Sequence, residues 1–408
     1  MVAQWLSRMV AMKALVVFSH LRWNFVYQRP QHLLSRLAQR WPVIFIEEPV
    51  PGAGEDRMEQ IAAAPGVEVW RPHVRGAAHG FHAEHKAVMQ RLVAHAMREH
   101  QLKDYWVWFY TPMALPLAEH LSPDGIIYDC MDELSAFKNA PQQLLDQEAE
   151  LLRISDVVFT GGRSLYNAKR HRHANIHCFP SSVDAMHFRR ATRDHPKQAH
   201  LAHPRLGYCG VIDERIDLAL IAGVADARAD WEIVMVGPIV KIDPASAPRR
   251  ANIHYLGQQG YDDLPAFISG WDVCLLPFAL NESTRFISPT KTLEYMACGR
   301  PSVSTRIRDV VEPYGHVVPI HDDAAGFVQA CEAALQRSPQ EQAAHAEQLA
   351  AIIARTSWDA TAAAMAELIA EAEVARDGDD AVPHASSLRA TAGLPEARAK
   401  AGTAAVAG

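Results

Sequence analysis

Between residues 281 and 301 the chain reads Asn-Glu-Ser-Thr-Arg-Phe-Ile-Ser-Pro-Thr-Lys-Thr-Leu-Glu-Tyr-Met-Ala-Cys-Gly-Arg-Pro. An apolar run, Val273–Pro277, precedes this segment and a second β-rich run, Ser302–Thr305, follows it, so the pattern predicts a helix between two strands. We expect Ser288 to be the N-cap of that helix and Pro289 its first residue. Such a strand–helix–strand unit is typical of a parallel sheet.

The amino end of the predicted helix has the features of an anion-binding site. The first N–H groups of a helix have no intrahelical partner, and Arg285, Thr290 and Lys291 add charge and hydrogen-bond donors around them. Glu294 lies three residues after Lys291 and therefore on the same side of the helix. A carboxylate there would repel a phosphate but would accept hydrogen bonds from two ribose hydroxyls, so the pattern favours a nucleotide. The alternative is a Lys–Glu surface pair on an ordinary capped helix.

The same alternation of β-rich runs and helical patterns extends through the whole chain. With 408 residues, the chain exceeds the roughly 250–300 residues at which a single core stops growing. We therefore expect an α/β protein with two Rossmann-like domains, at residues 12–190 and 200–372, joined by a polar linker at His187–Pro204. We also expect the C-terminal helices of the chain to pack back on these domains and residues 375–408 to form a disordered tail.

The predicted elements fall into two series. Strands are expected at 14–18, 43–46, 67–70, 105–109, 125–129, 156–160 and 176–179, and then at 205–211, 231–236, 253–256, 273–277 and 302–305. Helices are expected at 26–39, 84–100, 141–154 and 164–171, and then at 216–228, 264–270, 290–298, 324–336, 339–355 and 358–372.

Composition excludes several classes of protein. No apolar run is long enough to span a bilayer and Met1–Lys13 lacks the apolar stretch of a signal peptide, so we expect a cytoplasmic protein; whether residues 1–11 belong to the native chain stays open. The six cysteines form no C-x-x-C pair, which favours reduced core residues. The chain has a net charge of −7 and neither half is basic, so nucleic acid is not an expected partner.

A basic cluster consists of Arg163, Lys169, Arg170 and Arg172. It could contact anionic lipid or a polyanionic acceptor, or it could be a solvated helix face.

Ser288–Val303 resembles the nucleotide-sugar motif P-x-K-x-x-E-Y-M-A-x-G-x-P-V-V of GT-B glycosyltransferases, especially the retaining family 4, glycosyl transferases group 1. The resemblance implies that Glu294 holds the donor ribose and that the preceding loop holds the diphosphate. Cys178–Asp184 resembles the segment that closes the N-terminal domain of the family. Leu206–Arg215 resembles its first C-terminal strand and loop, which implies that Gly210 and Arg215 face the donor phosphates.

The segment Phe18–Leu34 resembles a subgroup akin to teichuronic-acid-type transferases. Together these similarities imply two domains that face each other across a cleft, the first for the acceptor and the second for the donor. They imply transfer of a sugar, without a bound metal or other cofactor, from a UDP- or GDP-linked donor to a glycan or lipid-linked acceptor. Exopolysaccharide or cell-envelope synthesis, in the cytoplasm or at the inner face of the plasma membrane, is the implied setting; the donor sugar, the acceptor and the oligomeric state stay open.

The chain also departs from the family pattern. Many retaining members have a second glutamate eight positions before the ribose-binding one, and Phe286 stands there in this chain. A lysine usually follows the arginine of the phosphate loop by about five residues, where this chain has Leu220; Lys241 or Lys291 could supply that charge. A retaining reaction is the expected one, but these differences leave the stereochemistry open.

The first half should hold the acceptor. Asp132 and Glu133 follow a predicted strand, and Asp132 is the candidate general base of an inverting reaction; the alternative is that both acids balance a helix dipole. His20 follows the first strand and is either a catalytic or a structural histidine. Gln28, Arg29 and His32 on the next helix are candidates for acceptor or phosphate contacts. Our catalytic candidates are Asp132, His20, Arg215 and Lys291.

Other functions would require other sequence features. A nicotinamide-dependent oxidoreductase requires a G-x-G-x-x-G turn, which neither the segment after Phe18 nor that after Gly207 has. The histidine pairs His82/His85 and His171/His173 lack a third ligand nearby, so we expect no metal site. A non-hydrolysing nucleotide-sugar epimerase, or an inactive nucleotide-sugar-binding partner of another transferase, stays open.

Overall fold

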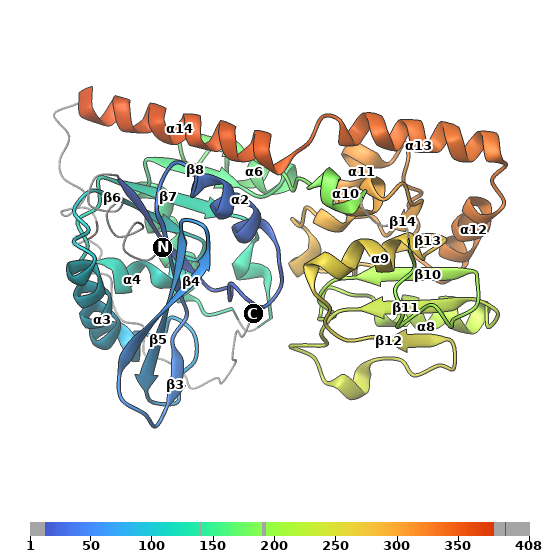
Figure 1. The fold of residues 1–408 in the computed structure, drawn as a ribbon, viewed down its shortest axis with the longest axis horizontal. Helices are drawn as coiled ribbons and strands as arrows, with labels where there is room; N and C mark the ends of the chain where they lie inside the picture. The colour runs from blue at the N-terminus through green and yellow to red at the C-terminus, as the bar shows by residue number, and fades with distance from the viewer. Residues whose placement is uncertain (1–12, 139, 190–192, 379–387, 389–408) are drawn as a thin grey trace. The chain divides into compact units, whose positions relative to one another are not determined.

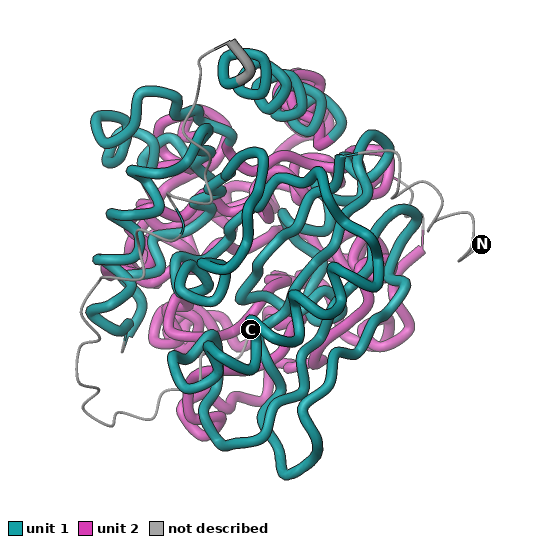
Figure 2. Tube along the Cα trace, turned by 90° about the vertical axis from the view of Figure 1, so that its left-hand side faces the viewer, with its two compact units in different colours: residues 1–179, 359–408 teal, residues 180–358 magenta. Residues whose placement is uncertain are grey.

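The computed structural model describes residues 13–138, 140–189, 193–378 and 388. Its residues divide into two compact units, which Figures 1 and 2 show. Unit 1 comprises the described residues up to Phe179 and those from Asp359 onward, and unit 2 comprises Pro180–Trp358. The division therefore lies before the linker that the sequence suggested, and the end of the chain belongs to the first unit.

Unit 1 is built on one nine-stranded sheet in the order β3-β5-β2-β1-β6-β7-β8-β9, with β4 paired antiparallel to β5 and all other pairs parallel. The central strands β1, β2 and β6 are buried along their whole length and are apolar except for Ser19 and Glu47 at their ends, as expected when helices cover both faces. The strands are β1 (Ala14–Ser19), β2 (Val43–Glu47), β3 (Val50–Gly52), β4 (Arg57–Ala64), β5 (Val67–Arg75), β6 (Tyr105–Phe109), β7 (Gly125–Cys130), β8 (Val157–Thr160) and β9 (Ile176–Cys178).

The helices of unit 1 are α2 (Arg29–Leu37), α3 (Lys86–Glu99), α4 (Leu115–Ala118), α5 (Gln143–Ile154) and α6 (Arg163–Lys169). A long final helix, α14 (Trp358–Gly378), packs back on this unit through three ion pairs. Arg36 lies 2.7 Å from Asp359, Arg376 lies 3.5 Å from Asp156, and Lys13 pairs with Glu373. The predicted tail begins too early, because 375–378 are helical; its remainder, apart from Leu388, lies outside the described residues.

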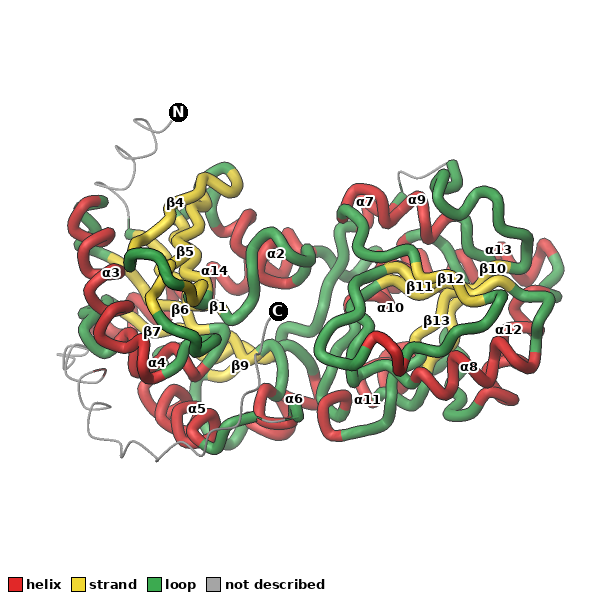
Figure 3. Tube along the Cα trace, turned by 90° about the horizontal axis from the view of Figure 1, so that it is seen from below, coloured by secondary structure: helices red, strands yellow, loops and turns green. Residues whose placement is uncertain are grey.

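Unit 2 has a five-stranded, fully parallel sheet in the order β12-β11-β10-β13-β14, with helices on both sides of the strands (Figure 3). Helices α8 and α12 contact each other, as do α10 and α13. The strands are β10 (Arg205–Cys209), β11 (Glu232–Val236), β12 (Ile253–Tyr255), β13 (Val273–Leu276) and β14 (Ser302–Ser304). The helices are α7 (Ala185–Phe188), α8 (Leu218–Ala227), α9 (Leu264–Ser269), α10 (Thr290–Ala297), α11 (Arg308–Tyr314), α12 (Ala324–Leu335) and α13 (Pro339–Ile353).

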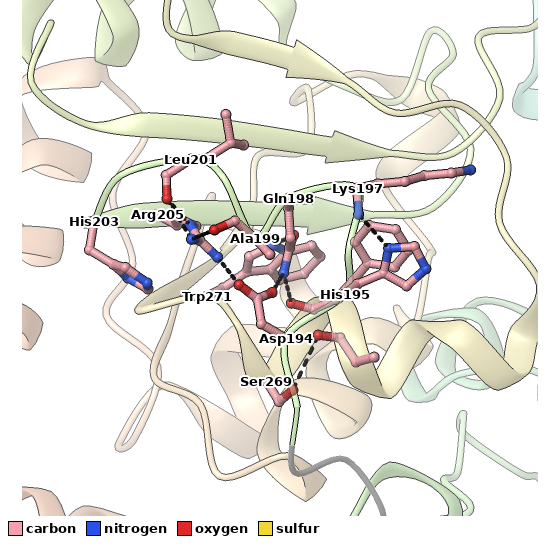
Figure 4. Close-up of polar contacts among 12 residues, drawn as sticks. Asp194, His195, Lys197, Gln198, Ala199, Leu201, His203, Arg205, Ser269 and Trp271 are labelled. Carbon is pink, nitrogen blue, oxygen red and sulfur yellow. Dashed lines mark hydrogen bonds and ion pairs between the residues drawn. The ribbon is translucent and has the colours of Figure 1, made fainter.

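The predicted interdomain linker is, over its described residues, part of unit 2. Figure 4 shows the polar contacts of this segment. The fully buried Gln198 donates to the carbonyl oxygen of Phe267 at 2.9 Å and to Asp194 at 2.6 Å. Its amide oxygen accepts a hydrogen bond from the indole of Trp271 at 2.9 Å, while the buried guanidinium of Arg205 pairs with Asp194. Although most of the segment is exposed, Asp194 and Gln198 anchor it to the core of unit 2 through these polar contacts.

The six cysteines are free thiols, as expected. Four of them are buried, and Cys178 and Cys298 are partly buried. Burial raises the pKa of the thiols of Cys209 and Cys331 to about 12. These thiols are therefore protonated and unreactive at neutral pH.

Candidate functional site

The sheet of unit 2 reverses its direction of winding between β10 and β13. From β10 the chain moves outward to β11 and β12 and then returns to β13 on the other side of β10. In open parallel sheets, ligands bind beyond the carboxyl ends of the strands at such a switch point. The loops that leave β10, β11 and β13 are joined there: Ile212 N–H donates to the carbonyl oxygen of Pro238 at 2.9 Å and Ala279 N–H to that of Arg215 at 2.8 Å.

Two glycines bring the backbones of the first two loops into contact. Gly210 (φ +150°) follows β10 and Gly237 (φ +145°) follows β11. A Cβ on Gly237 would lie 1.9 Å from the carbonyl oxygen of Gly210, and a Cβ on Gly210 would lie 2.6 Å from the hydroxyl of Tyr208. Neither position accepts a side chain, so peptide groups rather than side chains form this part of the edge. The sequence motif pointed to Gly210 but not to Gly237.

Gly237→Ala is expected to destabilise unit 2 by about 2 kcal/mol or more, because the new methyl group meets the Gly210 carbonyl in a backbone conformation reserved for glycine. Urea unfolding measures the change. Gly257→Ala is the matched control: Gly257 also has a positive φ of +69°, but a Cβ there would meet nothing within 4 Å. Equal losses of stability in the two variants would contradict the close backbone contact.

The helix of the quoted motif is α10, and its amino end lies at this edge of the sheet. Pro289 is the N-cap, with an extended ψ of 115°, and Thr290 is the first helical residue, so the prediction that Ser288 caps the helix is wrong. Ser288 instead binds Ser181: its carbonyl oxygen accepts from the Ser181 hydroxyl at 2.5 Å. Thr290 Oγ1 lies 3.2 Å from the same hydroxyl. Since no side chain caps α10, its first N–H groups remain suited to an anion.

Lys291 and Glu294 form a buried ion pair one turn into α10. Lys291 Nζ lies 2.7 Å from Glu294 Oε2, and the two side chains are 16% and 2% exposed. Burial acts to lower the pKa of Lys291, but the Glu294 carboxylate outweighs it and the pKa lies above its usual value. The Lys–Glu pair therefore exists, but it is not the surface pair that we considered as an alternative.

The ion pair lies beside the end of β10. The charges of Lys291 and Glu294 both act on the Cys209 thiol, the residue directly before Gly210. The hydroxyl of Tyr295, a residue the motif contains but whose role we did not foresee, accepts a hydrogen bond from Cys209 N–H at 3.0 Å. The structure thus brings together the glycine loop, the open helix end, a cation and a carboxylate, as a site for a phosphate and a diol would require.

Three other predicted donor residues lie in the segments that follow β10, β13 and β11. Arg215 Nη2 lies 2.7 Å from Oδ2 of the buried Asp213, so the guanidinium of Arg215 stabilises the turn that contains both residues. Arg285 is 63% exposed, with its guanidinium over the ring of Phe286 and 3.4 Å from Glu282. Lys241 is exposed and has a positive φ of 61°. Their contacts with donor phosphates remain predictions.

In unit 1 the equivalent switch point lies between β1 and β6, and the partly buried His20 follows β1 there. Arg29 is buried and its guanidinium contacts Asp129 at 3.1 and 2.9 Å and the carbonyl oxygen of Phe179 at 2.8 Å. This geometry gives Arg29 a structural role in joining α2 to the ends of β7 and β9. Burial acts to lower the pKa of Arg29, but the Asp129 carboxylate acts to raise it. The Asp132 carboxylate lies near enough to add a smaller increase.

The remaining acceptor-side candidates are mostly engaged within unit 1. Gln28 is the N-cap of α2, and its N–H donates to the side chain of Gln31 at 3.1 Å. His32 is buried with its ring edge-on to Tyr27. Glu133 lies 2.7 Å from Lys169.

The basic cluster on α6 is not the surface patch that the sequence suggested. Lys169 is only 4% exposed, because its ammonium is bound by Glu133 and Glu148. Arg163, Arg170 and Arg172 remain exposed. The prediction that all four side chains could contact a lipid or an acceptor is therefore wrong, because Lys169 points into unit 1.

Within the part of the chain that the structure describes, no helix is both long and apolar enough to span a bilayer. In the same part, no three His, Cys, Asp or Glu side chains converge as ligands of a metal ion. The histidines that we weighed as ligands make other contacts: His85 bonds the carbonyl oxygen of Ala78 at 3.0 Å and His173 that of Ser155 at 2.9 Å.

Residues 203–337 match the family described as glycosyl transferases group 1. This segment is a glycosyl transferases group 1 domain. It contains the glycine loops, α10 and the Lys291–Glu294 pair, so the group 1 domain carries every element of the candidate donor site that the structure brings together. The resemblance predicted from the motifs is confirmed.

Three known proteins extend the comparison. A Bacillus subtilis protein, provisionally named a teichuronic acid biosynthesis glycosyltransferase, is 24% identical over 256 residues, which are 57% of this chain and 64% of that protein. Sucrose-phosphate synthase from Thermosynechococcus elongatus has a TM-score of 0.70 at 14% identity, with 89% of this chain and 100% of that chain covered. The Anabaena protein HepE, in complex with UDP and glucose, has a TM-score of 0.63 at 12% identity, with 88% and 100% covered. The predicted GT-B class of fold is confirmed.

Proposed function

We propose that this protein is a glycosyltransferase, which moves a sugar from a nucleoside-diphosphate sugar to a glycan or lipid-linked acceptor. The observation that carries the proposal is the Lys291–Glu294 pair at the open end of α10, beside the glycine loop after β10. The group 1 domain and the HepE complex with UDP and glucose support a nucleotide-sugar donor. The name of the Bacillus subtilis relative supports a cell-envelope polysaccharide, although the match spans 64% of its length.

In this proposal, unit 2 binds the donor. The N–H groups of Thr290 and Lys291 and the peptide edge at Gly210 hold the pyrophosphate, since a helix end concentrates partial positive charge there. The ammonium of Lys291 turns from Glu294 to the phosphate, and the Glu294 carboxylate then accepts hydrogen bonds from the ribose hydroxyls. The ion pair of the ligand-free protein is thus exchanged for two contacts with the nucleotide, which avoids leaving either charge buried and alone.

The chemical step forms one bond and breaks one. An acceptor hydroxyl oxygen bonds to the anomeric carbon, and the bond from that carbon to the phosphate oxygen breaks, so the nucleoside diphosphate leaves with the electron pair. Positive charge and N–H dipoles at the phosphate stabilise the leaving group. The acceptor proton passes to the Asp132 carboxylate in an inverting reaction or to the leaving phosphate in a retaining one.

We further propose that the reaction needs no bound metal or other cofactor and retains the configuration at the anomeric carbon. Lys291 supplies the positive charge that a metal would otherwise provide at the phosphate. The donor is UDP- or GDP-linked and the reaction takes place in the cytoplasm or at the inner face of the membrane. Nucleic acid has no part in it.

Incubation with radiolabelled UDP- and GDP-sugars, with and without candidate glycan and lipid-linked acceptors, tests the proposal. Transfer of label to an acceptor is the expected result. Interconversion of the nucleotide sugar without an acceptor would instead identify an epimerase, and binding without either reaction would identify a non-catalytic nucleotide-sugar-binding protein. Anomeric analysis of the product, by NMR, tests retention, and activity in EDTA tests metal independence.

A further inference from the structure

A cluster of buried charges lies under the loop that follows β7 in unit 1. The ammonium of Lys169, on α6, lies 2.7 Å from Glu133 Oε2 and 2.7 Å from Glu148 Oε1, on α5. Glu148 is 3% exposed and also accepts a hydrogen bond from the hydroxyl of Tyr128 at 2.9 Å. Arg172, 3.4 Å from Glu148, balances the second carboxylate. Each carboxylate therefore has a cation beside it.

Stability alone does not account for such a cluster. Removing two or more charges from water costs about as much as their attraction returns, so apolar side chains of similar size would hold the helices together at least as well. What an ion pair adds over apolar contact is direction, because the ammonium fixes where the carboxylate of Glu133 lies. Glu133 is part of the loop after β7, whereas Lys169 and Glu148 belong to helices of the frame.

The same loop is held further by the turn after β8 and by two contacts within the loop itself. Gly161, directly after β8, packs on its backbone: a Cβ there would lie 2.3 Å from the carbonyl oxygen of Met131, and Gly161 N–H donates to the carbonyl oxygen of Cys130 at 2.9 Å. The thiol of Cys130 lies 3.6 Å from the carbonyl oxygen of Asp132. The hydroxyl of Ser135 donates to Glu133 Oε1 at 2.6 Å.

Asp132 lies between these contacts, with Glu133 next to it in the chain. Each of these contacts acts on the backbone of Asp132 or on its neighbours, and the charge of Asp132 itself acts on Arg29. A loop after a parallel strand is otherwise adaptable, and a displacement of about 1 Å in a reacting group costs up to about a hundredfold in rate. A carboxylate that must meet an acceptor hydroxyl gains from a support of this kind.

We propose that Lys169 is a positioning residue, which fixes the Cys130–Ser135 loop through Glu133 so that the Asp132 carboxylate meets the acceptor. This inference rests on the proposed function, and it adds to it a residue that contacts neither substrate. Lys169 acts together with Glu148, which holds the ammonium from the side of the frame. Gly161 serves the same end by letting the β8–α6 turn close on Met131.

Lys169→Met and Glu133→Gln test the inference. Each is expected to lower kcat/KM for the acceptor by about tenfold to a hundredfold, while the Kd for UDP or GDP, measured by calorimetry, stays within about twofold of wild type. Glu133→Gln leaves the Lys169–Glu148 pair intact, so it reports on the loop even if Lys169→Met fails to fold. Arg153→Met, which removes a cation from an exposed pair with Glu150 on α5, is the matched control and should change neither value.

Hydrogen exchange provides a readout that does not require activity. Amides of residues 131–136 should exchange faster in Lys169→Met and Glu133→Gln than in wild type and in Arg153→Met. Unchanged kcat/KM for the acceptor and unchanged exchange in a folded Glu133→Gln protein would overturn the positioning role. Absence of transfer by the wild-type protein would contradict the proposed function instead, and the two failures are therefore distinguishable.

Discussion

Glu294→Ala is expected to weaken the binding of UDP or GDP about a hundredfold. A hydrogen bond to a charged group contributes about 1.5–3 kcal/mol, and the carboxylate is proposed to accept two from the ribose. A loss of about 2.8 kcal/mol corresponds to a hundredfold change in Kd. Calorimetry with each nucleotide measures the loss.

Two further variants separate binding from stability. Glu294→Ala also leaves the buried ammonium of Lys291 without its partner, which lowers the stability of unit 2 by about 3–5 kcal/mol. Glu294→Gln keeps the volume and an oxygen for Lys291 and should still bind the nucleotide at least about tenfold more weakly, because the charge is lost. Glu312→Gln breaks an exposed pair with Arg308 on α11 and is the control. Wild-type affinity in a folded Glu294→Gln protein would remove Glu294 from the site.

In an inverting reaction, where Asp132 takes the acceptor proton, Asp132→Asn is expected to lower kcat about a hundredfold, the contribution of a general base, and to leave the Kd for the nucleotide unchanged. The reason is that Asp132 lies in unit 1, whereas the proposed nucleotide contacts are in unit 2. Steady-state kinetics with saturating donor and a range of acceptor concentrations give kcat and KM separately. Asp146→Asn, at an exposed position on α5, is the control.

A different outcome would decide between mechanisms. If the leaving phosphate takes the acceptor proton, as proposed for a retaining reaction, Asp132→Asn should raise the acceptor KM more than it lowers kcat. Turnover and acceptor KM both equal to wild type would show that Asp132 takes no part in the reaction. The anomeric configuration of the product then distinguishes the remaining possibilities.

Most of the strands could be predicted because parallel strands covered on both faces are uninterrupted apolar runs. Tyr105–Phe109 was predicted without error, and the strand at Val43 differs from the structure by a single residue. β4 (Arg57–Ala64) was missed, since no residue of this antiparallel edge strand is buried and its apolar part, Ile61–Ala64, is mostly alanine, which is depleted in strands. The short helix α11 was missed too; it has seven residues and contains Pro313.

The division into units could not be read from composition. A polar, proline-containing segment has the same composition whether water or other polar side chains satisfy it. Gln198, Asp194 and Arg205 satisfy one another and so make the predicted linker part of unit 2. Similarly, the lysine on α6 resembled a surface cation until Glu133 and Glu148, remote in sequence, were placed against it.

The donor site was predictable where its residues are close in sequence. Lys291 and Glu294 share one helical turn, so their spacing alone put them together. The contribution of Gly237 and Ser181 depends on how separate loops meet at the edge of the sheet, and no local pattern signals it. For Arg285, whose place before the helix suggested a phosphate contact, the side chain is exposed over Phe286, and that contact stays a prediction.

A crystal structure of the protein with UDP or GDP tests the central claim most directly. We expect the diphosphate within hydrogen-bond distance of the N–H groups of Thr290 and Lys291, and the ribose hydroxyls on a Glu294 carboxylate that has released Lys291. A nucleotide bound elsewhere, with the Lys291–Glu294 contact still at its present 2.7 Å, would contradict the account.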